Sequence, residues 1–339
     1  MDGKHNKLIS VIVPCYNVYD LVDKCIESLV NQTIGLDKLQ LILVDDASTD
    51  STFEKLCSYE RKYPENIIVI HCDQNGKQGT ARNIGLAYAT GDYIGFVDSD
   101  DWVELDMYEK LYSAACEGDY EIVQGGVIRD IDGHEEIVAS VKDNIIFDIN
   151  DAESRLRYIK DGADGFFYSC IYERDFLLNS GIRFLEGIFY EDIFFVGAIK
   201  FAVKRVLKIK NNVYHYRYNP QSTMSGRNAL RHLDRLQSLL TLRKWYKNHG
   251  LFAEYGDYID AEFVQLFYLN SLHMFFTRFD RVPVDIFNYL QKQLIKEVPD
   301  HRDAYCRYNE YHAFLNYIDQ NMTQEWLDRI QVSYLEDIM

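Results

Sequence analysis

The chain has 339 residues, of which 47% are hydrophobic and 26% charged, which is enough for two domains with their own cores. Its net charge of −17 argues against a general nucleic-acid binder, because phosphate backbones would repel it. The seven cysteines lack CxxC spacing, which predicts reduced thiols, and no apolar run reaches the roughly 18 residues of a transmembrane helix. A short polar N-terminus without a secretory signal predicts a cytoplasmic protein.

Residues 8–130 alternate short apolar runs with helical patterns. Because the runs are apolar throughout, they indicate strands of a parallel sheet that is buried on both faces. The predicted strands are 8–13, 39–44, 67–71, 93–97 and 121–128. The predicted helices are 18–29, a segment after Ser48-Thr49-Asp50, and 80–89. This alternation predicts a doubly wound, mostly parallel α/β sheet, which binds ligands beyond the carboxyl ends of its strands.

The pattern after residue 130 is mixed at first and then helical. The predicted elements are a polar hairpin over 131–150, helices at 151–160 and 191–203, and strands at 206–209 and 213–218. From Arg227 onward, amphipathic stripes predict helices with breaks near Gly250, Pro283 and Pro299. We therefore predict an α/β domain over 1–225 and a helical domain over 226–339, joined by a loop at 219–227.

An acidic cluster follows the fourth predicted strand. Asp98, Asp100 and Asp101 are three carboxylates within four residues, and they repel one another unless a cation or solvent compensates them. Oxygen ligands of this kind suit Mg²⁺ or Mn²⁺, which bind through one or two carboxylates and the phosphates of a substrate. The alternative is a solvated acidic turn, but the position at the end of a core strand favours a metal site.

Polar residues also follow the first two strands. Asp45 and Asp46 end the second strand, where a carboxylate can accept hydrogen bonds from a nucleobase or a ribose hydroxyl. The alternative role of these residues is to cap the following helix. Tyr16, after the first strand, can lie flat on a base or pack into the core.

Four strings, taken in order and spacing, resemble the family-2 glycosyltransferases with the GT-A fold. They are VIVPCYN (11–17), LVDDASTD (43–50), GTARNIGLAYATGDYIGFVDSDD (79–101) and FYEDIFF (189–195). The resemblance covers roughly residues 8–225 and implies a place in bacterial surface-polysaccharide synthesis.

The resemblance also implies roles for individual residues. It assigns the general base to Asp192 and an orienting role to Glu191. The nucleotide and donor contacts that it implies are Pro14, Tyr16, Asn17, Asp45, Asp46, Arg82, Asp98, Ser99 and Arg217. The implied metal ligands are Asp100, with Asp98 and Asp101 beside it, and His215 is a further candidate on the closing strand. The stretch Tyr168-Ser169-Cys170 departs from the family pattern, which affects the expected acceptor pocket.

The implied reaction is a single displacement that transfers a sugar from a nucleotide donor, UDP in the first instance, to an acceptor hydroxyl with inversion at the anomeric carbon. Two other classes are open: a noncatalytic nucleotide- or carbohydrate-binding protein on the same scaffold, and another nucleotide enzyme. A dehydrogenase would need a G-x-G-x-x-G loop after the first strand. A nucleotidyltransferase would need a Gly-rich basic loop there, and the chain has PCYN.

Residues 200–247 form a basic segment in an acidic chain. The segment contains twelve Lys or Arg and one acid, a net +11, which leaves −28 for the remaining residues. One explanation is pairing with acidic residues elsewhere in the fold. The other is a surface that faces an anionic acceptor, such as a lipid-linked diphosphate at the inner face of the membrane or a phosphate-bearing polymer. The aromatic residues of the C-terminal helices indicate core or dimer contacts.

Overall fold

The computed structural model describes residues 7–219, 226–310 and 312–338. Contacts divide the chain into two compact units, Met1–Asn219 and Pro220–Met339, which we call the α/β unit and the helical unit. The division falls close to the boundary at 225/226 that the sequence predicts. Residues 220–225 of the predicted joining loop lie outside the described residues.

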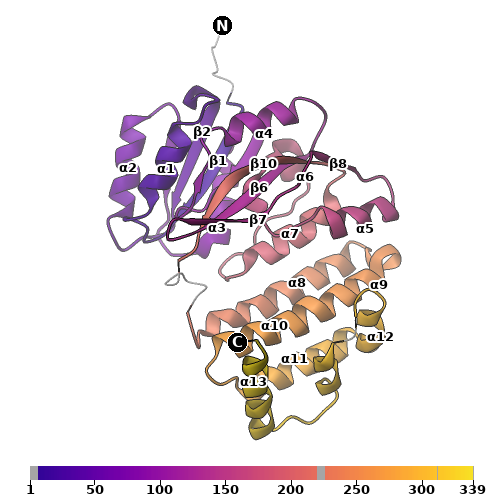
Figure 1. The fold of residues 1–339 in the computed structure, drawn as a ribbon. Helices are drawn as coiled ribbons and strands as arrows, with labels where there is room; N and C mark the ends of the chain where they lie inside the picture. Colours follow the sequence, from indigo (N-terminus) through magenta and orange to yellow (C-terminus); the bar gives the residue numbers. More distant parts are fainter. Residues whose placement is uncertain (1–6, 220–225, 311, 339) are drawn as a thin grey trace. The chain divides into compact units, whose positions relative to one another are not determined.

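The α/β unit is built on one mixed sheet, shown in Figure 1. Its strands are β1 (Ile9–Cys15), β2 (Leu39–Asp45), β3 (Ile67–His71), β4 (Tyr93–Phe96), β5 (Trp102–Val103), β6 (Ile122–Ile131), β7 (His134–Ala139), β8 (Ile145–Asp148), β9 (Cys170–Glu173) and β10 (Arg205–Arg217). They lie in the order β3-β2-β1-β4-β9-β6-β10-β5, with β7 paired to β6 and β8 to β10.

Strands β1 to β4 form the parallel half of the sheet that the sequence predicts. β2 and β4 both pair with β1 in parallel, and β3 pairs with β2. Every residue of β1 is buried, which agrees with an apolar run covered on both faces. Because these strands run in parallel, Cys15, Asp45 and His71 lie side by side at their carboxyl ends.

Three features of the sheet differ from the prediction, and the first is β5, a two-residue strand antiparallel to β10 where no strand was predicted. β9 lies antiparallel between β4 and β6, where no strand was predicted. The predicted strands 206–209 and 213–218 are one strand, β10, whose pairing with β6 shifts register between Lys208 and Tyr214. This irregularity falls at Asn211 and Asn212, in the gap between the two predicted strands.

Seven α-helices accompany the described part of this sheet. They are α1 (Val22–Val30), α2 (Thr52–Lys62), α3 (Lys77–Tyr88), α4 (Met107–Ala115), α5 (Ala152–Asp161), α6 (Arg174–Asn179) and α7 (Glu191–Ala202), with 3-10 turns at Leu36–Lys38 and Phe167–Ser169. The stripe Val22, Cys25, Ile26 and Leu29 of α1 is buried, as its spacing predicts. α5 begins at a capping box between Asp151 and Ser154.

The described part of the helical unit contains only helical elements, as predicted. They are a 3-10 turn (Leu230–Leu233), α8 (Asp234–Asn248), α9 (Phe252–Phe263), a π-helical stretch (Val264–Leu269), α10 (Asn270–Arg278), α11 (Val284–Glu297), α12 (His301–Cys306), a 3-10 turn (Ala313–Tyr317) and α13 (Gln324–Ile338). The predicted breaks at Gly250, Pro283 and Pro299 all separate these helices. Gly250 has φ +71°, a conformation that favours glycine.

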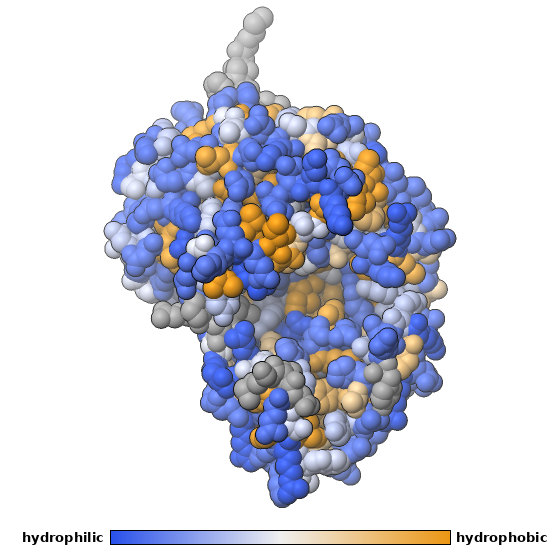
Figure 2. Space-filling model, in the orientation of Figure 1, coloured by the Kyte–Doolittle hydropathy of each residue, from blue (hydrophilic) through white to orange (hydrophobic). Residues whose placement is uncertain are grey.

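The surface in Figure 2 is mainly hydrophilic on the face in view, with apolar side chains distributed among the polar ones. Among the described residues, none of the helices is both long and apolar enough to cross a bilayer.

Candidate functional site

The loop after β1 supplies one side of the candidate site. Tyr16 is 45% exposed, so its ring is available to a ligand rather than packed in the core. Asn17 has φ +52°, and its Oδ1 accepts hydrogen bonds from the backbone of Thr49 at 2.8 Å and of Asp50 at 3.4 Å. Asn17 therefore holds the turn after β2 in place. Pro14 is buried within β1 opposite Val44, so it belongs to the strand that precedes this loop and is not itself exposed to a ligand.

The two carboxylates after β2 have different surroundings. Asp45 is fully buried, and its Oδ2 lies 2.7 Å from His71 Nδ1 and accepts from the Ser48 backbone at 3.3 Å. Asp46 Oδ1 accepts from the Gly76 backbone at 2.8 Å, and burial raises the pKa of Asp46. Asp45 thus shapes the strand end, while Asp46 joins the end of β2 to the loop before α3.

Sequence reasoning missed Asn75 in that loop. The Asn75 Nδ2 donates to the backbone carbonyl of Asp46 at 3.2 Å, so its carboxamide lies beside the predicted base-binding carboxylate. The following Lys77 has φ +65°, and its Nζ donates to the carbonyl of Gly187 at 2.8 Å. The Asn75-Gly76 dipeptide between a strand and a helix was the available signal, because such pairs mark tight turns.

The acidic cluster after β4 is placed as predicted, but its members have different partners. Both oxygens of Asp101 accept hydrogen bonds, Oδ2 from the Tyr214 hydroxyl and Oδ1 from the Arg217 backbone, each at 2.8 Å. Asp101 is 1% exposed and Ser99 is also buried. Asp101 therefore fastens the cluster to β10, a role that competes with the metal ligation predicted for it.

Asp100 is half-buried, and its pKa is raised to about 6. Burial is the first cause, since it disfavours the charged form, and the neighbouring charge of Asp98 is the second. Ionisation of Asp100 at neutral pH therefore costs electrostatic free energy. A cation bound to it would relieve that penalty.

Arg82 joins the acidic cluster to the predicted catalytic motif. Its Nη2 donates to Asp98 Oδ1 at 2.6 Å and its Nη1 donates to Glu191 Oε1. Arg82 is 3% exposed, and its guanidinium packs against the rings of Phe167 and Phe184, at 4.9 and 5.1 Å from their centroids. Residues 82, 98 and 191 lie on α3, after β4 and at the start of α7, so this bridge fixes the acidic cluster and the predicted catalytic motif relative to each other.

A close approach of α3 to the segment before α7 makes the bridge possible. A Cβ on Gly79 would lie 2.1 Å from the carbonyl oxygen of Leu185 and about 3 Å from the Glu191 side chain. Only glycine fits at this crossing, which brings Arg82, one helical turn later, to Glu191.

Replacing Arg82 by Met is expected to lower the free energy of unfolding by about 3 kcal/mol, because it leaves two buried or half-buried carboxylates without their shared cation. Arg82→Lys should lower the free energy of unfolding by less, because it keeps the positive charge. Some loss should remain, since an ammonium group cannot reach both carboxylates as the planar guanidinium does. Urea unfolding measures both, with Arg61→Met on the exposed face of α2 as a matched control. Equal stability of Arg82→Met and wild type would contradict the bridge.

Asp192 lies in the first turn of α7 and is half-buried. Burial and then the Glu191 carboxylate raise its pKa to about 6, while the charge of Arg82 acts in the opposite direction. Tyr190, directly before the helix, has φ +61° and turns the chain into α7. Asp192 is thus ionised at neutral pH but more basic than an ordinary aspartate.

His215 and Arg217 lie on β10 against Trp102. The His215 ring stacks on Trp102 with centroids 5.1 Å apart, and its Nε2 lies 2.7 Å from Glu104 Oε1. The Arg217 guanidinium lies 5.2 Å from the Trp102 centroid. His215 already has a carboxylate partner, so the structure favours a structural role for it.

The predicted metal ligands do not form a complete metal-binding site on their own. Among the residues that the structure describes, no group of three or more His, Cys, Asp or Glu side chains is arranged to hold a metal ion. Asp100 fits a different arrangement, in which Mg²⁺ or Mn²⁺ is held by one or two carboxylates and by the oxygens of a bound diphosphate. The raised pKa of Asp100 is the observation that fits it.

The basic segment 200–247 is divided between the two units, and several of its cations are paired. In the α/β unit, Arg205 and Lys208 pair with acids at 2.7 and 2.6 Å. In the helical unit, the Arg243 side chain is only 4% exposed and pairs with Asp260 at 2.6 Å and Glu297 at 3.2 Å. These pairs favour the explanation that the segment balances acidic residues of the fold, and the predicted anionic-acceptor or membrane surface finds no support.

Comparisons with known proteins agree with this geometry. The family model described as "Glycosyl transferase family 2" matches residues 10–176. The poly(ribitol-phosphate) beta-glucosyltransferase of Bacillus spizizenii is 42% identical over 118 residues, which are 34% of this chain and 18% of that protein. The uncharacterized glycosyltransferase EpsJ of Bacillus subtilis is 32% identical over 63% of this chain and 62% of its own length. The chain therefore spans less than two thirds of both relatives.

A solved structure of S. aureus TarS residues 1–349 with UDP-GlcNAc superposes with a TM-score of 0.73. The match covers 97% of this chain and 92% of that one at 21% sequence identity, and it shows a common fold. The expected α/β, GT-A-like architecture with a helical C-terminal region is thereby confirmed. The segment of residues 10–176 thus belongs to glycosyl transferase family 2.

Proposed function

We propose that this chain transfers a sugar from a UDP-sugar to an acceptor hydroxyl with inversion at the anomeric carbon. The observation that carries the proposal is the Arg82 bridge, which joins Asp98 of the acidic cluster to Glu191, the neighbour of Asp192. The proposed site thus combines an acidic cluster that suits a divalent cation with a carboxylate base. The UDP-bound TarS structures support a uridine nucleotide as the donor.

The donor end would bind the nucleotide through the loop and strand ends already described. Tyr16 offers an exposed ring to the base, and Asp46 with Asn75 offers hydrogen-bonding groups to its edge. Asp98 and Asp100 lie on the diphosphate and sugar side. A divalent cation on Asp100 would supply Lewis-acid stabilisation of the departing diphosphate.

The acceptor end would use Asp192 as general base. A carboxylate with a pKa near 6 accepts a proton from an alcohol more readily than an ordinary aspartate, as the hydroxyl oxygen attacks the anomeric carbon. Glu191, held by Arg82, keeps the first turn of α7 in position. Alignment of hydroxyl and sugar in one site supplies a further part of the rate enhancement.

The names of two relatives support the proposed polymer class and the proposed stereochemistry. Two of them are named for wall polymers, the poly(ribitol-phosphate) beta-glucosyltransferase and the minor teichoic acid biosynthesis protein GgaB of B. subtilis. Common UDP-hexose donors are α-linked, so a β-glucosyl product implies inversion. We therefore place this chain in the synthesis of a bacterial surface glycan.

The direct test measures UDP release from UDP-Glc, UDP-Gal, UDP-GlcNAc and UDP-GalNAc with Mn²⁺ or Mg²⁺, each with and without hydroxyl acceptors. Turnover of at least one donor, with a β linkage in the product by NMR, is the expected result. Tight UDP binding without turnover of any donor would favour the noncatalytic binding protein, and an α product would exclude single displacement.

A further inference from the structure

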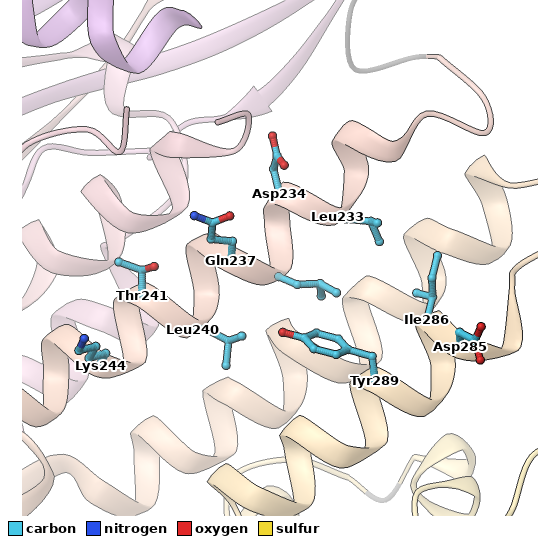
Figure 3. A pocket seen from close by; sticks show the side chains of 10 residues that line it. Leu233, Asp234, Gln237, Leu240, Thr241, Lys244, Asp285, Ile286 and Tyr289 are labelled. Carbon is cyan, nitrogen blue, oxygen red and sulfur yellow. The ribbon is translucent and has the colours of Figure 1, made fainter. Parts of the chain in front are cut away.

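A groove of about 630 Å³ lies in the helical unit between α8 and α11, and none of its lining residues is assigned to the donor site. Figure 3 shows Tyr289 reaching from α11 toward α8, beside Leu240, with Ile286 facing Leu233. Its volume is in the range of small-molecule and oligosaccharide sites, roughly 300–1,000 Å³.

The floor of the groove is apolar and partly aromatic. Leu236 is 4% exposed, and Leu233, Leu240 and Ile286 are half-buried around it. The Tyr289 side chain is 43% exposed, so a large part of its surface is open to solvent. An exposed tyrosine over aliphatic neighbours offers a flat surface with a hydroxyl at its end.

The rim carries polar side chains that the fold does not use. Gln237, Thr241 and Lys244 recur at three- and four-residue spacing along α8, and Asp285 lies at the start of α11. None of these four side chains makes a hydrogen bond or ion pair within the described residues. Together they present an amide, a hydroxyl, an ammonium and a carboxylate, which supply both hydrogen-bond donors and acceptors.

The charge of the lining selects the class of ligand. Lys244 and Asp285, the two charged side chains of the rim, have opposite charges, so the rim has no net charge that would attract a phosphate-bearing polymer. A ligand with many hydroxyls and no net charge matches both the mixed rim and the aromatic floor. Sugars have this chemistry, because each ring has an apolar C–H face and a belt of hydroxyls.

We propose that the groove between α8 and α11 binds a neutral oligosaccharide. The inference deepens the proposed function, since a growing glycan acceptor would belong to this class, and it rests on that function for its biological meaning. Its chemistry depends only on the helical unit. Binding in the groove would hold a chain of sugars by several weak contacts rather than by one strong charge pair.

The test measures binding of maltotetraose and tetra-N-acetylchitotetraose to the full chain without donor, by calorimetry and saturation-transfer NMR, with tetragalacturonate as the acidic comparison. At least one neutral tetramer should bind at millimolar concentration. Tyr289→Ala should weaken it about tenfold and Tyr289→Phe much less, because stacking depends on the ring. Tyr308→Ala is the matched control, since Tyr308 is 50% exposed in the same unit and outside the groove.

Three results would overturn the proposal: no binding of either neutral tetramer, equal binding by Tyr289→Ala, or tighter binding of tetragalacturonate. Dimerisation that Tyr289→Ala abolishes, without saccharide binding, would instead make the groove an interface between copies. UDP affinity, measured in parallel, should be unchanged in every variant. Saccharide binding without UDP release from any UDP-sugar would leave this inference standing while the proposed function fails. UDP release without saccharide binding in the groove would support the proposed function and overturn this inference.

Discussion

Replacement of Asp192 by Asn is expected to lower kcat by a factor on the order of 10²–10⁴ while UDP affinity stays at the wild-type level. The amide has nearly the shape of the carboxylate but cannot take a proton from the acceptor. Arg82, Asp98 and Glu191 keep their hydrogen bonds in this variant, so the donor end remains assembled. Steady-state turnover and UDP titration of the same preparation measure the two quantities.

The pH dependence of the wild type gives a second view of the same group. Burial and the Glu191 carboxylate raise the pKa of Asp192 to about 6. A base works in its ionised form, so activity should be level above this pH and fall as the pH drops through it. This fall in activity at low pH should disappear in Asp192→Asn. If the residual activity of the variant still falls at the same pH, the titrating group is Asp100, whose pKa is also about 6.

Asp161→Asn serves as the matched control for this substitution. Asp161 is an exposed aspartate at the end of α5, and the same change there should leave kcat and the pH profile unaltered. Turnover within twofold of wild type in Asp192→Asn would exclude Asp192 as the base. In that case Glu191 would remain as the only carboxylate of the motif, and its engagement with Arg82 would need to be reconsidered.

The parallel half of the sheet could be predicted from local sequence, because each buried strand is a self-contained apolar run. The short strand β9 could not, since its four residues become a strand only through antiparallel pairing with β4 and β6. Helix α4 was also missed, and β10 was divided at Asn211 and Asn212. For β9 and β10 the deciding interactions are pairings with strands far away in the chain.

The candidate site shows the same division. The positions of Asp98, Asp100 and Asp192 at element ends were readable from motif order and spacing. The partners of these residues were not, because Arg82 and Glu191 are 109 residues apart and Asp101 and Tyr214 are 113 apart. The basic segment misled for the same reason: Arg243 appears in the sequence as a free cation, while the fold buries it between Asp260 and Glu297.

Replacement of Asp100 by Asn should abolish metal-dependent turnover and at the same time raise the thermal stability of the protein at pH 8. The loss of activity follows from its place beside Asp98, where a cation on the diphosphate would need an anionic ligand. The gain in stability follows from its pKa. A carboxyl whose folded-state pKa is raised stabilises the fold only below its unfolded pKa, and this contribution is lost as the pH rises through about 6.

Melting temperature and turnover of Asp100→Asn together test whether Asp100 binds the metal and whether its charge destabilises the fold. Wild type and Asp100→Asn should have similar melting temperatures at about pH 3, below the ordinary aspartate pKa of 3.8, where Asp100 is protonated in both the folded and the unfolded state, and should diverge in favour of the variant at pH 8. Mn²⁺ with UDP should raise the melting temperature of the wild type more than that of the variant, because ligands that bind only the folded state stabilise it. Scanning fluorimetry and UDP release measure these effects, with Asp161→Asn again as control. Near-normal turnover would remove Asp100 from the metal site, whereas a lower melting temperature at pH 8 would show that its charge is already compensated within the fold.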